Sequence, residues 1–138
     1  MPELKDVNTF LNDLVTAFPE IKGEVLDEDY QDLIALQVGC LTRFSQAAIK
    51  AEDWKTVARC IKFVNESFDQ VEFSVENSLA ISYLGKLEFS QESMAEKLLP
   101  KNLCEIRETL LEYYESIRTQ PHFTPKKKDK KKARYLRS

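Results

Sequence analysis

The sequence is short of glycine and cysteine, and each shortage excludes a class of protein. Three Gly among 138 residues leave little material for a glycine-rich phosphate-binding loop. Cys40, Cys60 and Cys104 are widely spaced and form no CxxC pair, so neither a disulfide framework nor a thiolate metal site is predicted. We expect buried thiols in a reducing compartment, and we predict no metal and no cofactor.

Histidine is almost absent, and this argues against catalysis. His122 is the only one, and it lies near the C-terminus in a segment that offers little to hold a Ser/His or Cys/His pair rigid. No set of residues supplies a nucleophile, a base and an oxyanion stabiliser together. We therefore predict that the protein is not an enzyme.

Long apolar runs are also missing. No stretch approaches the roughly 18 apolar residues that predict a membrane-spanning helix. The first thirty residues lack a basic segment followed by an apolar run, so no signal peptide is predicted. The expected location is the cytoplasm.

What the sequence does contain is charge divided between two parts of the chain. Residues 1–120 carry 22 Asp and Glu against 12 Lys and Arg, a formal −10, whereas residues 121–138 carry 8 Lys and Arg against one acid, a formal +7. The overall charge of −3 conceals this division. We predict an acidic helical domain over 1–120 and a basic, disordered tail over 121–138. An acidic body favours a basic partner, and a lysine-rich tail favours an anionic one.

The pattern of apolar residues predicts an all-α fold of five or six helices packed as antiparallel helical hairpins. Apolar side chains recur at spacings of three and four. The expected helices cover about 4–17, 29–51, 53–68, 74–86, 90–99 and 103–119. The short break at Glu52 and Asp53 predicts a hairpin. Asp53 is expected to cap the third helix, and Ser74 is expected to cap the fourth. The second helix has a wide apolar band that includes Leu33 and Leu36, so we expect it to be central, and Trp54 is expected in the core.

Two groups of carboxylates are candidate contacts for a cationic partner. The first crowds the predicted start of the second helix, where the helix dipole alone can explain it. The second falls on one face of the last helix at spacings of three, four and three. No histidine accompanies it, so a solvated acidic face is favoured over a di-metal site. The groups are Asp27, Glu28, Asp29 and Asp32, and Glu105, Glu108, Glu112 and Glu115.

Five short segments match a pattern found in other proteins. They are Phe18-Pro19-Glu20-Ile21, Ala51-Glu52-Asp53-Trp54, Val75-Glu76-Asn77, Ser82-Tyr83-Leu84 and Leu98-Leu99-Pro100. Through these segments the chain resembles, over about residues 10–105, a group of small, all-helical bacterial proteins of unassigned function, some of which look like immunity proteins of polymorphic toxin systems. The resemblance implies a cytoplasmic inhibitor that captures a sibling toxin. Gly85 stands where that pattern has an acidic residue, and the lysine tail lies outside the resemblance.

Our leading hypothesis is a non-enzymatic binding protein, an immunity or antitoxin-like inhibitor of a toxin with a basic surface. Both acidic groups would contact the partner, with Glu76 and Asn77 as further contacts. The alternative is a helical scaffold or regulatory adaptor whose tail binds nucleic acid or an anionic membrane. The tail residues concerned are Lys126, Lys127, Lys128, Lys130, Lys131 and Lys132. In a third hypothesis the tail lies on the acidic body itself.

Overall fold

Helices make up most of residues 3–119, the part of the chain that the computed structural model describes. The α-helices are α1 (Val7–Ala17), α2 (Lys22–Val25), α3 (Ile34–Lys50), α4 (Trp54–Phe68), α5 (Phe73–Ser78), α6 (Glu92–Leu98) and α7 (Lys101–Thr119). Two 3₁₀ turns, η1 (Pro19–Ile21) and η2 (Glu28–Tyr30), and a π-helix, η3 (Leu79–Leu84), complete the order. No strand forms between residues 3 and 119, so the all-α prediction is confirmed. The tail predicted over 121–138 lies outside the described residues.

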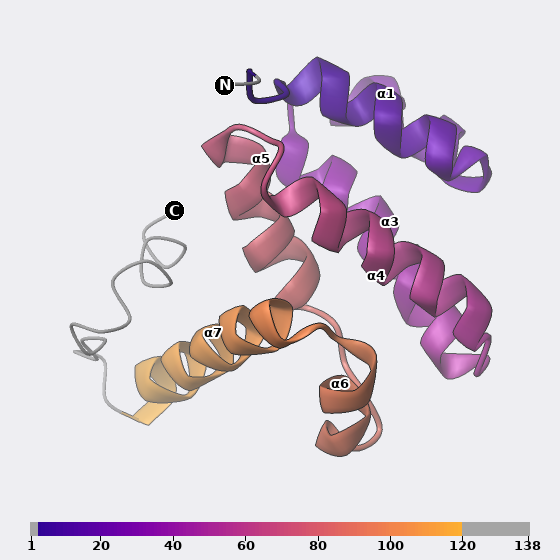
Figure 1. Cartoon of the computed structure of the whole chain (residues 1–138). Helices are drawn as coiled ribbons and strands as arrows, with labels where there is room; N and C mark the ends of the chain where they lie inside the picture. Colours follow the sequence, from indigo (N-terminus) through magenta and orange to yellow (C-terminus); the bar gives the residue numbers. More distant parts are fainter. Residues whose placement is uncertain (1–2, 120–138) are drawn as a thin grey trace.

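The helices are arranged around α3. Figure 1 shows α3 and α4 side by side, α1 against them, and α5 with its π-helical continuation crossing from this layer toward α6 and α7. The ring centroids of Phe10 in α1 and Phe63 in α4 are 5.8 Å apart, and α7 packs mainly against η3. Six of the helical segments correspond to predicted helices. The additional α-helix, α2, is a single turn.

The α3–α4 hairpin is formed where the sequence predicted it. Glu52 adopts a left-handed conformation with φ 57°, and its N–H donates to Ile49 O at 3.1 Å. The next N–H, from Asp53, donates to Ala48 O at 2.9 Å, which together with the Glu52 bond ends α3. The Asp53 carboxylate then accepts from the N–H of Thr56 at 3.3 Å and begins α4. One three-residue break, 51–53, therefore ends one helix and starts its partner.

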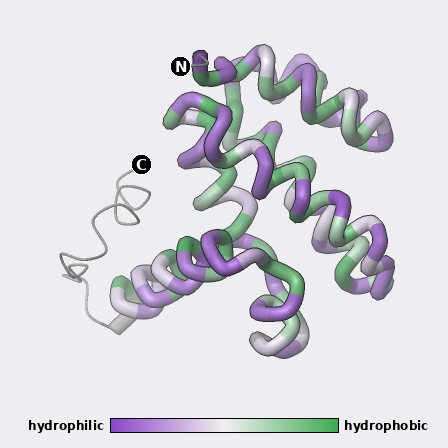
Figure 2. Tube along the Cα trace, in the orientation of Figure 1, coloured by the Kyte–Doolittle hydropathy of each residue, from purple (hydrophilic) through white to green (hydrophobic). Residues whose placement is uncertain are grey.

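The core lies where these helices meet. Figure 2 shows hydrophobic and hydrophilic residues alternating along each helix, as amphipathic helices require. Phe18 is fully buried and its ring meets Phe44 and Phe63 edge-on, with centroids 5.9 and 5.4 Å away. The largest fully buried side chains are Phe10, Leu14, Phe18, Val25, Val38, Leu41, Val57, Leu79, Tyr83, Leu84, Leu103 and Leu110.

The fourth predicted helix differs from the structure in two ways. It was expected to start at a Ser74 cap, but α5 already includes Phe73, and the Ser74 hydroxyl instead donates to the Glu72 carboxylate at 3.0 Å. From Leu79 onward it widens into the π-helix η3. Thr42 of α3 donates from its hydroxyl to Ser82 O at 2.7 Å, so a neighbouring helix satisfies a carbonyl in the widened segment. This bond is a tertiary contact that local propensity does not encode.

Three side chains expected in the core are exposed. Trp54 is 37% exposed and is the first residue of α4. Leu33 and Leu36 are 47% and 46% exposed because the apolar band of α3 is wider than the surface that its neighbours cover. The prediction that these three are buried is wrong, although the central position of α3 is confirmed.

Candidate functional site

The first acidic group forms a turn of its own rather than the first turn of α3. The Asp27 carboxylate accepts from the N–H of Asp29 at 2.8 Å and caps the 3₁₀ turn η2. Asp32 then adopts φ 63°, a left-handed conformation that redirects the chain into α3. Helix α3 starts only at Ile34, and its N-cap residue Leu33 makes no side-chain capping bond. The expected link between these acids and the α3 dipole is therefore wrong.

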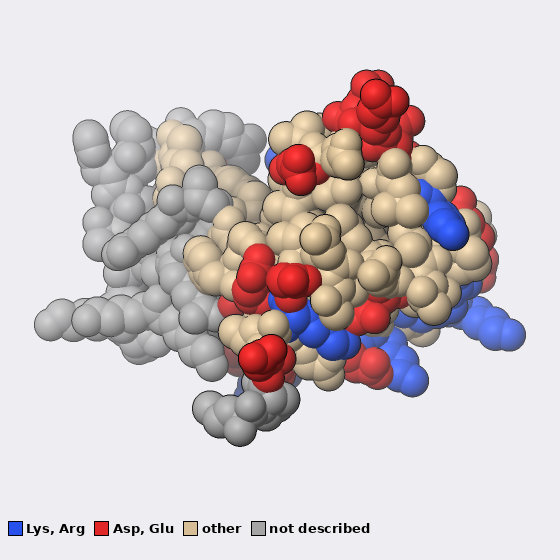
Figure 3. Space-filling model, turned by 90° about the horizontal axis from the view of Figure 1, so that it is seen from above, with Lys and Arg blue, Asp and Glu red and all other residues tan. Residues whose placement is uncertain are grey.

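The carboxylates of this turn carry uncompensated charge. Asp27, Glu28, Asp29 and Asp32 are all exposed, and none of them forms an ion pair with a described residue. By contrast, Glu24 in the preceding helix α2 is bound by Arg43, which raises the pKa of the Arg43 guanidinium. Figure 3 shows acidic side chains spread over one face of the molecule, with one group that has no lysine or arginine against it. The turn therefore presents net negative charge to solvent.

Large apolar side chains flank the same turn. Leu26 is 52% exposed on one side of η2, and Leu33 and Leu36 are 47% and 46% exposed on the other. Exposed leucines beside charged residues resemble a protein interface, with apolar anchors inside a polar rim. We call this set the η2 surface, and it consists of Leu26, Asp27, Glu28, Asp29, Asp32, Leu33 and Leu36.

A cavity of about 360 Å³ opens beside the η2 surface. Helix α1 contributes the apolar residues Val7 and Leu11 to its lining, and Leu26 is the third apolar residue. The acidic lining comes from three of the four carboxylates, since Asp29 does not border the cavity. The full lining is Val7, Asn8, Leu11, Leu26, Asp27, Glu28, Gln31, Asp32 and Gln37. The cavity lining thus combines apolar side chains with polar and negatively charged ones.

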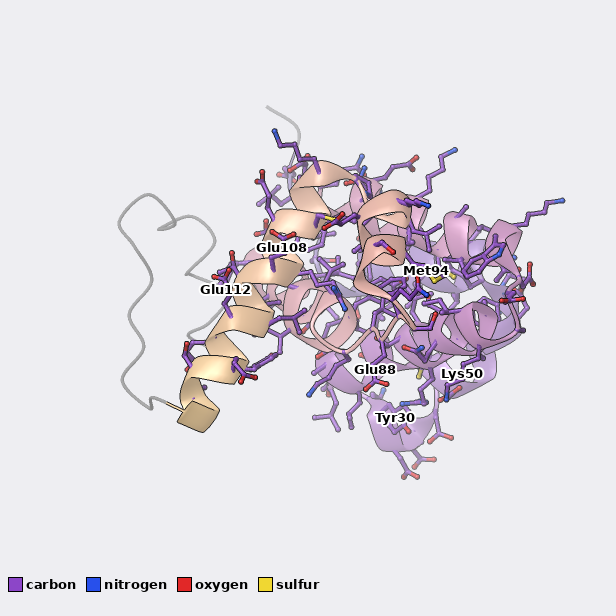
Figure 4. All side chains as sticks on the ribbon, turned by 90° about the horizontal axis from the view of Figure 1, so that it is seen from below. Tyr30, Lys50, Glu88, Met94, Glu108 and Glu112 are labelled. Carbon is purple, nitrogen blue, oxygen red and sulfur yellow. The ribbon has the colours of Figure 1, made fainter. Side chains whose placement is uncertain are left out.

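The second acidic group lies elsewhere on the molecule. Glu108, Glu112 and Glu115 are exposed along α7, and Glu105 is half-buried. Figure 4 shows Glu108 and Glu112 on α7, well away from Tyr30 of η2. The two groups therefore do not form one continuous patch, and a single small partner domain would contact one of them.

The remaining predicted contacts are not gathered at either acidic group. Glu76 and Asn77 lie in α5 and are half-buried, and Asn77 Oδ1 is buried with no hydrogen-bond donor in the part of the chain that the structure describes. The tail lysines Lys126–Lys132 lie outside the described residues. The η2 surface is therefore the best-defined candidate site.

A family model described as a domain of unknown function, DUF7674, matches residues 11–116. The chain belongs to this family. No curated protein and no solved structure matches it. The matched range covers most of α1 and continues into α7, so it includes the η2 surface and excludes the lysine-rich tail.

Within this family member, sequence reasoning found the acids of the η2 surface and missed its apolar part. Leu33 and Leu36 were assigned to the core because they continue the apolar spacing of α3. A usable signal was present, since Leu26 and Leu33 bracket the acidic run directly. Gln37 was also missed, although a glutamine inside an apolar band is a sign of a polar contact in the core.

Other features of the described residues define no second site of this kind. A hollow of about 380 Å³ is lined by residues that include Lys50, Glu88 and Met94, which Figure 4 labels, and by Trp54. Burial raises the pKa of the Cys40 thiol to about 11, which makes it a poor nucleophile. Among residues 3–119, no group of three or more His, Cys, Asp or Glu is placed to hold a metal ion. No helix in that range is long and apolar enough to cross a membrane.

Proposed function

We propose that this chain is a non-enzymatic binding protein that captures a basic protein partner through the η2 surface, in the manner of an immunity protein or antitoxin acting in the cytoplasm. The observation that carries the proposal is the juxtaposition of exposed leucines with carboxylates that form no ion pair with any residue in the described range 3–119. The apolar side chains would provide affinity on burial, and the charges would select a basic surface.

The charge of residues 1–120 supports the same partner chemistry. A formal charge of −10 speeds the encounter with a cationic protein and slows it with an anionic one. Many proteins that act on nucleic acids have basic clefts. An acidic surface bound in such a cleft would occupy the position of the phosphate backbone, so binding alone would keep the nucleic acid out and inhibit the partner.

The exposed groups on α7 would contact the partner only if its surface is large. Glu108 and Glu112 face solvent away from η2. A standard interface buries about 800 Å² on each side, and a partner that reaches both groups would have to extend from η2 to α7. Charge reversal at Glu108 therefore distinguishes the two cases. It should leave partner binding unchanged if the interface is confined to the η2 surface, and it should weaken binding if the interface extends to α7.

The test is co-expression of this protein with the product of the neighbouring open reading frame. We expect growth rescue and a stable complex on co-purification. The variant Leu33→Ser/Leu36→Ser should lose both, whereas Leu4→Ser should keep both, because Leu4 is 60% exposed but lies outside the η2 surface. No rescue and no complex with the unaltered chain would contradict the proposal.

The adaptor hypothesis is supported by the charge of the tail. Residues 121–138 carry a formal +7, enough to bind a phosphate-bearing polymer in a salt-dependent way. Deletion of 121–138 distinguishes the two functions. Neutralisation that persists without the tail favours the inhibitor, whereas loss of salt-sensitive binding to single-stranded DNA or anionic vesicles favours the adaptor.

A further inference from the structure

The cavity beside η2 contains a buried acceptor that the protein leaves unused. The side chain of Gln37 in α3 is one of the cavity-lining residues, and the residue is only 4% exposed. Its Nε2 donates to Val25 O at 3.3 Å, which fixes the orientation of the amide. Its Oε1 is buried, and no donor in the described part of the chain reaches it. A buried acceptor without a donor costs folding free energy, because its bond to water is lost and not replaced.

The bond to Val25 occupies the nitrogen end of the amide and leaves the oxygen end without a partner among the described residues. A donor that reaches Gln37 Oε1 would therefore complete the hydrogen bonding of the amide while Nε2 keeps its bond to Val25.

Three of the five other polar residues in the cavity lining favour the same kind of ligand. Asp27, Glu28 and Asp32 line it, and ionised carboxylates are hydrogen-bond acceptors only, whereas the amides of Asn8 and Gln31 can both donate and accept. The rest of the lining is apolar and consists of Val7, Leu11 and Leu26. The complement is a long apolar stem that carries several donors and a positive charge at its end.

We propose that the cavity receives an arginine side chain of the partner protein. The guanidinium donates to Gln37 Oε1 and to a carboxylate of Asp32 or Asp27, and the arginine stem packs between Leu11 and Leu26. This inference rests on the proposed function and adds the partner residue that the η2 surface recognises. It also explains why an exposed acidic turn is paired with a buried glutamine in α3.

Arginine fits this arrangement better than lysine for a geometric reason. A guanidinium has five N–H donors in a plane and can bridge an amide oxygen and a carboxylate at once. An ammonium is a compact, strongly hydrated charge, and it would have to lose that water to reach a buried oxygen. The cavity therefore selects for the planar head group.

The test uses the whole chain and a matched pair of acids. Asp29 and Asp32 carry the same charge in the same exposed turn, but only Asp32 lines the cavity. The probe is N-acetyl-arginine N-methylamide, titrated into ¹⁵N-labelled protein and followed by NMR, with the uncharged citrulline analogue as the blank. We expect shifts at the Gln37 side-chain amide and none with citrulline. The Asp32→Asn variant should weaken binding by about tenfold, whereas Asp29→Asn changes it by less than about twofold.

A second variant removes the buried acceptor itself. Gln37→Met keeps an unbranched side chain of similar length, so it should fold, and it should weaken arginine binding without changing the net charge. Equal weakening by the two Asp variants, unchanged binding by Gln37→Met, or tighter binding of the lysine analogue would each overturn the proposal.

A failure of the arginine-cavity proposal and a failure of the proposed function would give different experimental results. If the partner is captured but Asp29→Asn and Asp32→Asn weaken capture equally, the η2 surface binds through its general charge and the arginine cavity is wrong. If the probe binds as expected while no neighbouring product is neutralised, the cavity stands and the toxin-inhibitor function is wrong.

Discussion

The hydroxyl of Tyr83 lies 2.8 Å from the hydroxyl of Ser45, and this pair joins the π-helix η3 to α3 inside the core. Tyr83 is fully buried, and burial raises the pKa of its phenol well above the ordinary value, so the hydroxyl stays protonated at any physiological pH. The large tyrosine ring fills the space where η3 crosses α3, and Ser45 supplies the hydrogen bond that its polar end requires.

The first prediction concerns this pair. Ser45→Ala should lower the free energy of unfolding by about 1–3 kcal/mol, because it leaves the Tyr83 hydroxyl buried without a partner. Adding Tyr83→Phe should recover part of that loss, since the orphaned hydroxyl is then removed. Chemical denaturation of the two single variants and the double variant measures the coupling. Strict additivity of the two single effects would show that the hydroxyls are not coupled.

The second prediction concerns Gly85, which follows η3. Its N–H donates to Ala80 O at 2.9 Å, and a Cβ built at this position would lie 2.8 Å from Ile81 O. Gly85→Ala should therefore destabilise the protein by about 1–3 kcal/mol, as overpacking does. Gly23→Ala is the control, because a Cβ there meets nothing within 4 Å and the residue lies in a helix. It should be neutral or stabilising by up to about 1 kcal/mol. Thermal unfolding of both variants tests the contrast, and equal effects would contradict it.

The fold could be predicted from the sequence to the extent that it depends on local signals. Apolar spacing located the long helices, and Asp53 was identified as the cap of α4 from its position alone. The π-helical widening at Leu79 could not be predicted, because it depends on Thr42 and Ser45 contacts that join residues about forty positions apart. Periodicity also cannot tell how much of an apolar band the neighbouring helices will cover, and that is why Leu36 was misassigned.

The candidate site could be predicted only in its charge. A run such as Asp27–Asp32 is visible in any sequence, but the same run serves equally as a helix cap. The structure adds that none of these four carboxylates has an ion-pair partner among residues 3–119, whereas Glu24 nearby is paired with Arg43. The role proposed for Gln37 depends on a hydrogen bond to Val25 twelve positions earlier, so its unused oxygen is visible only in three dimensions.

The third prediction is a pH dependence at the start of α4. Hydrogen bonds from the hydroxyl of Thr56, at 2.7 Å, and from its N–H, at 3.3 Å, lower the pKa of the Asp53 carboxyl below its ordinary value. Because the folded pKa lies below the unfolded one, this stabilisation is complete above about pH 4 and is lost as the pH falls through the folded value. The melting temperature of Asp53→Ala should thus lie below that of the unaltered chain at pH 7, and the gap should narrow toward pH 2.

The control for this prediction is Asp53→Asn. Asparagine also accepts a hydrogen bond at an N-cap but does not titrate, so its advantage over alanine should persist at low pH. A gap between the aspartate and alanine proteins that stays constant from pH 7 to pH 2 would show that the carboxylate is not the stabilising group.

The last prediction separates the two ways in which acids of the η2 surface act on a bound partner. A charge at the rim of an interface mainly changes the association rate and its salt dependence, whereas a charge that is hydrogen-bonded in the buried interface mainly changes dissociation. Asp29 does not line the cavity and Asp32 does. We therefore expect Asp29→Asn to lower the association rate modestly at low salt and to leave dissociation unchanged, while Asp32→Asn also accelerates dissociation by about tenfold. Surface plasmon resonance between about 50 and 300 mM salt measures the two rates separately, and the effect of Asp29→Asn on the association rate should become smaller at high salt as the Debye length shrinks.

Two outcomes would contradict this prediction in different ways. An association rate that does not depend on salt would show that the η2 surface is not where the partner docks. Identical effects of the two variants on both rates would leave the surface in place and remove the cavity from recognition, because only a side chain seated beside Asp32 can make the two acids differ.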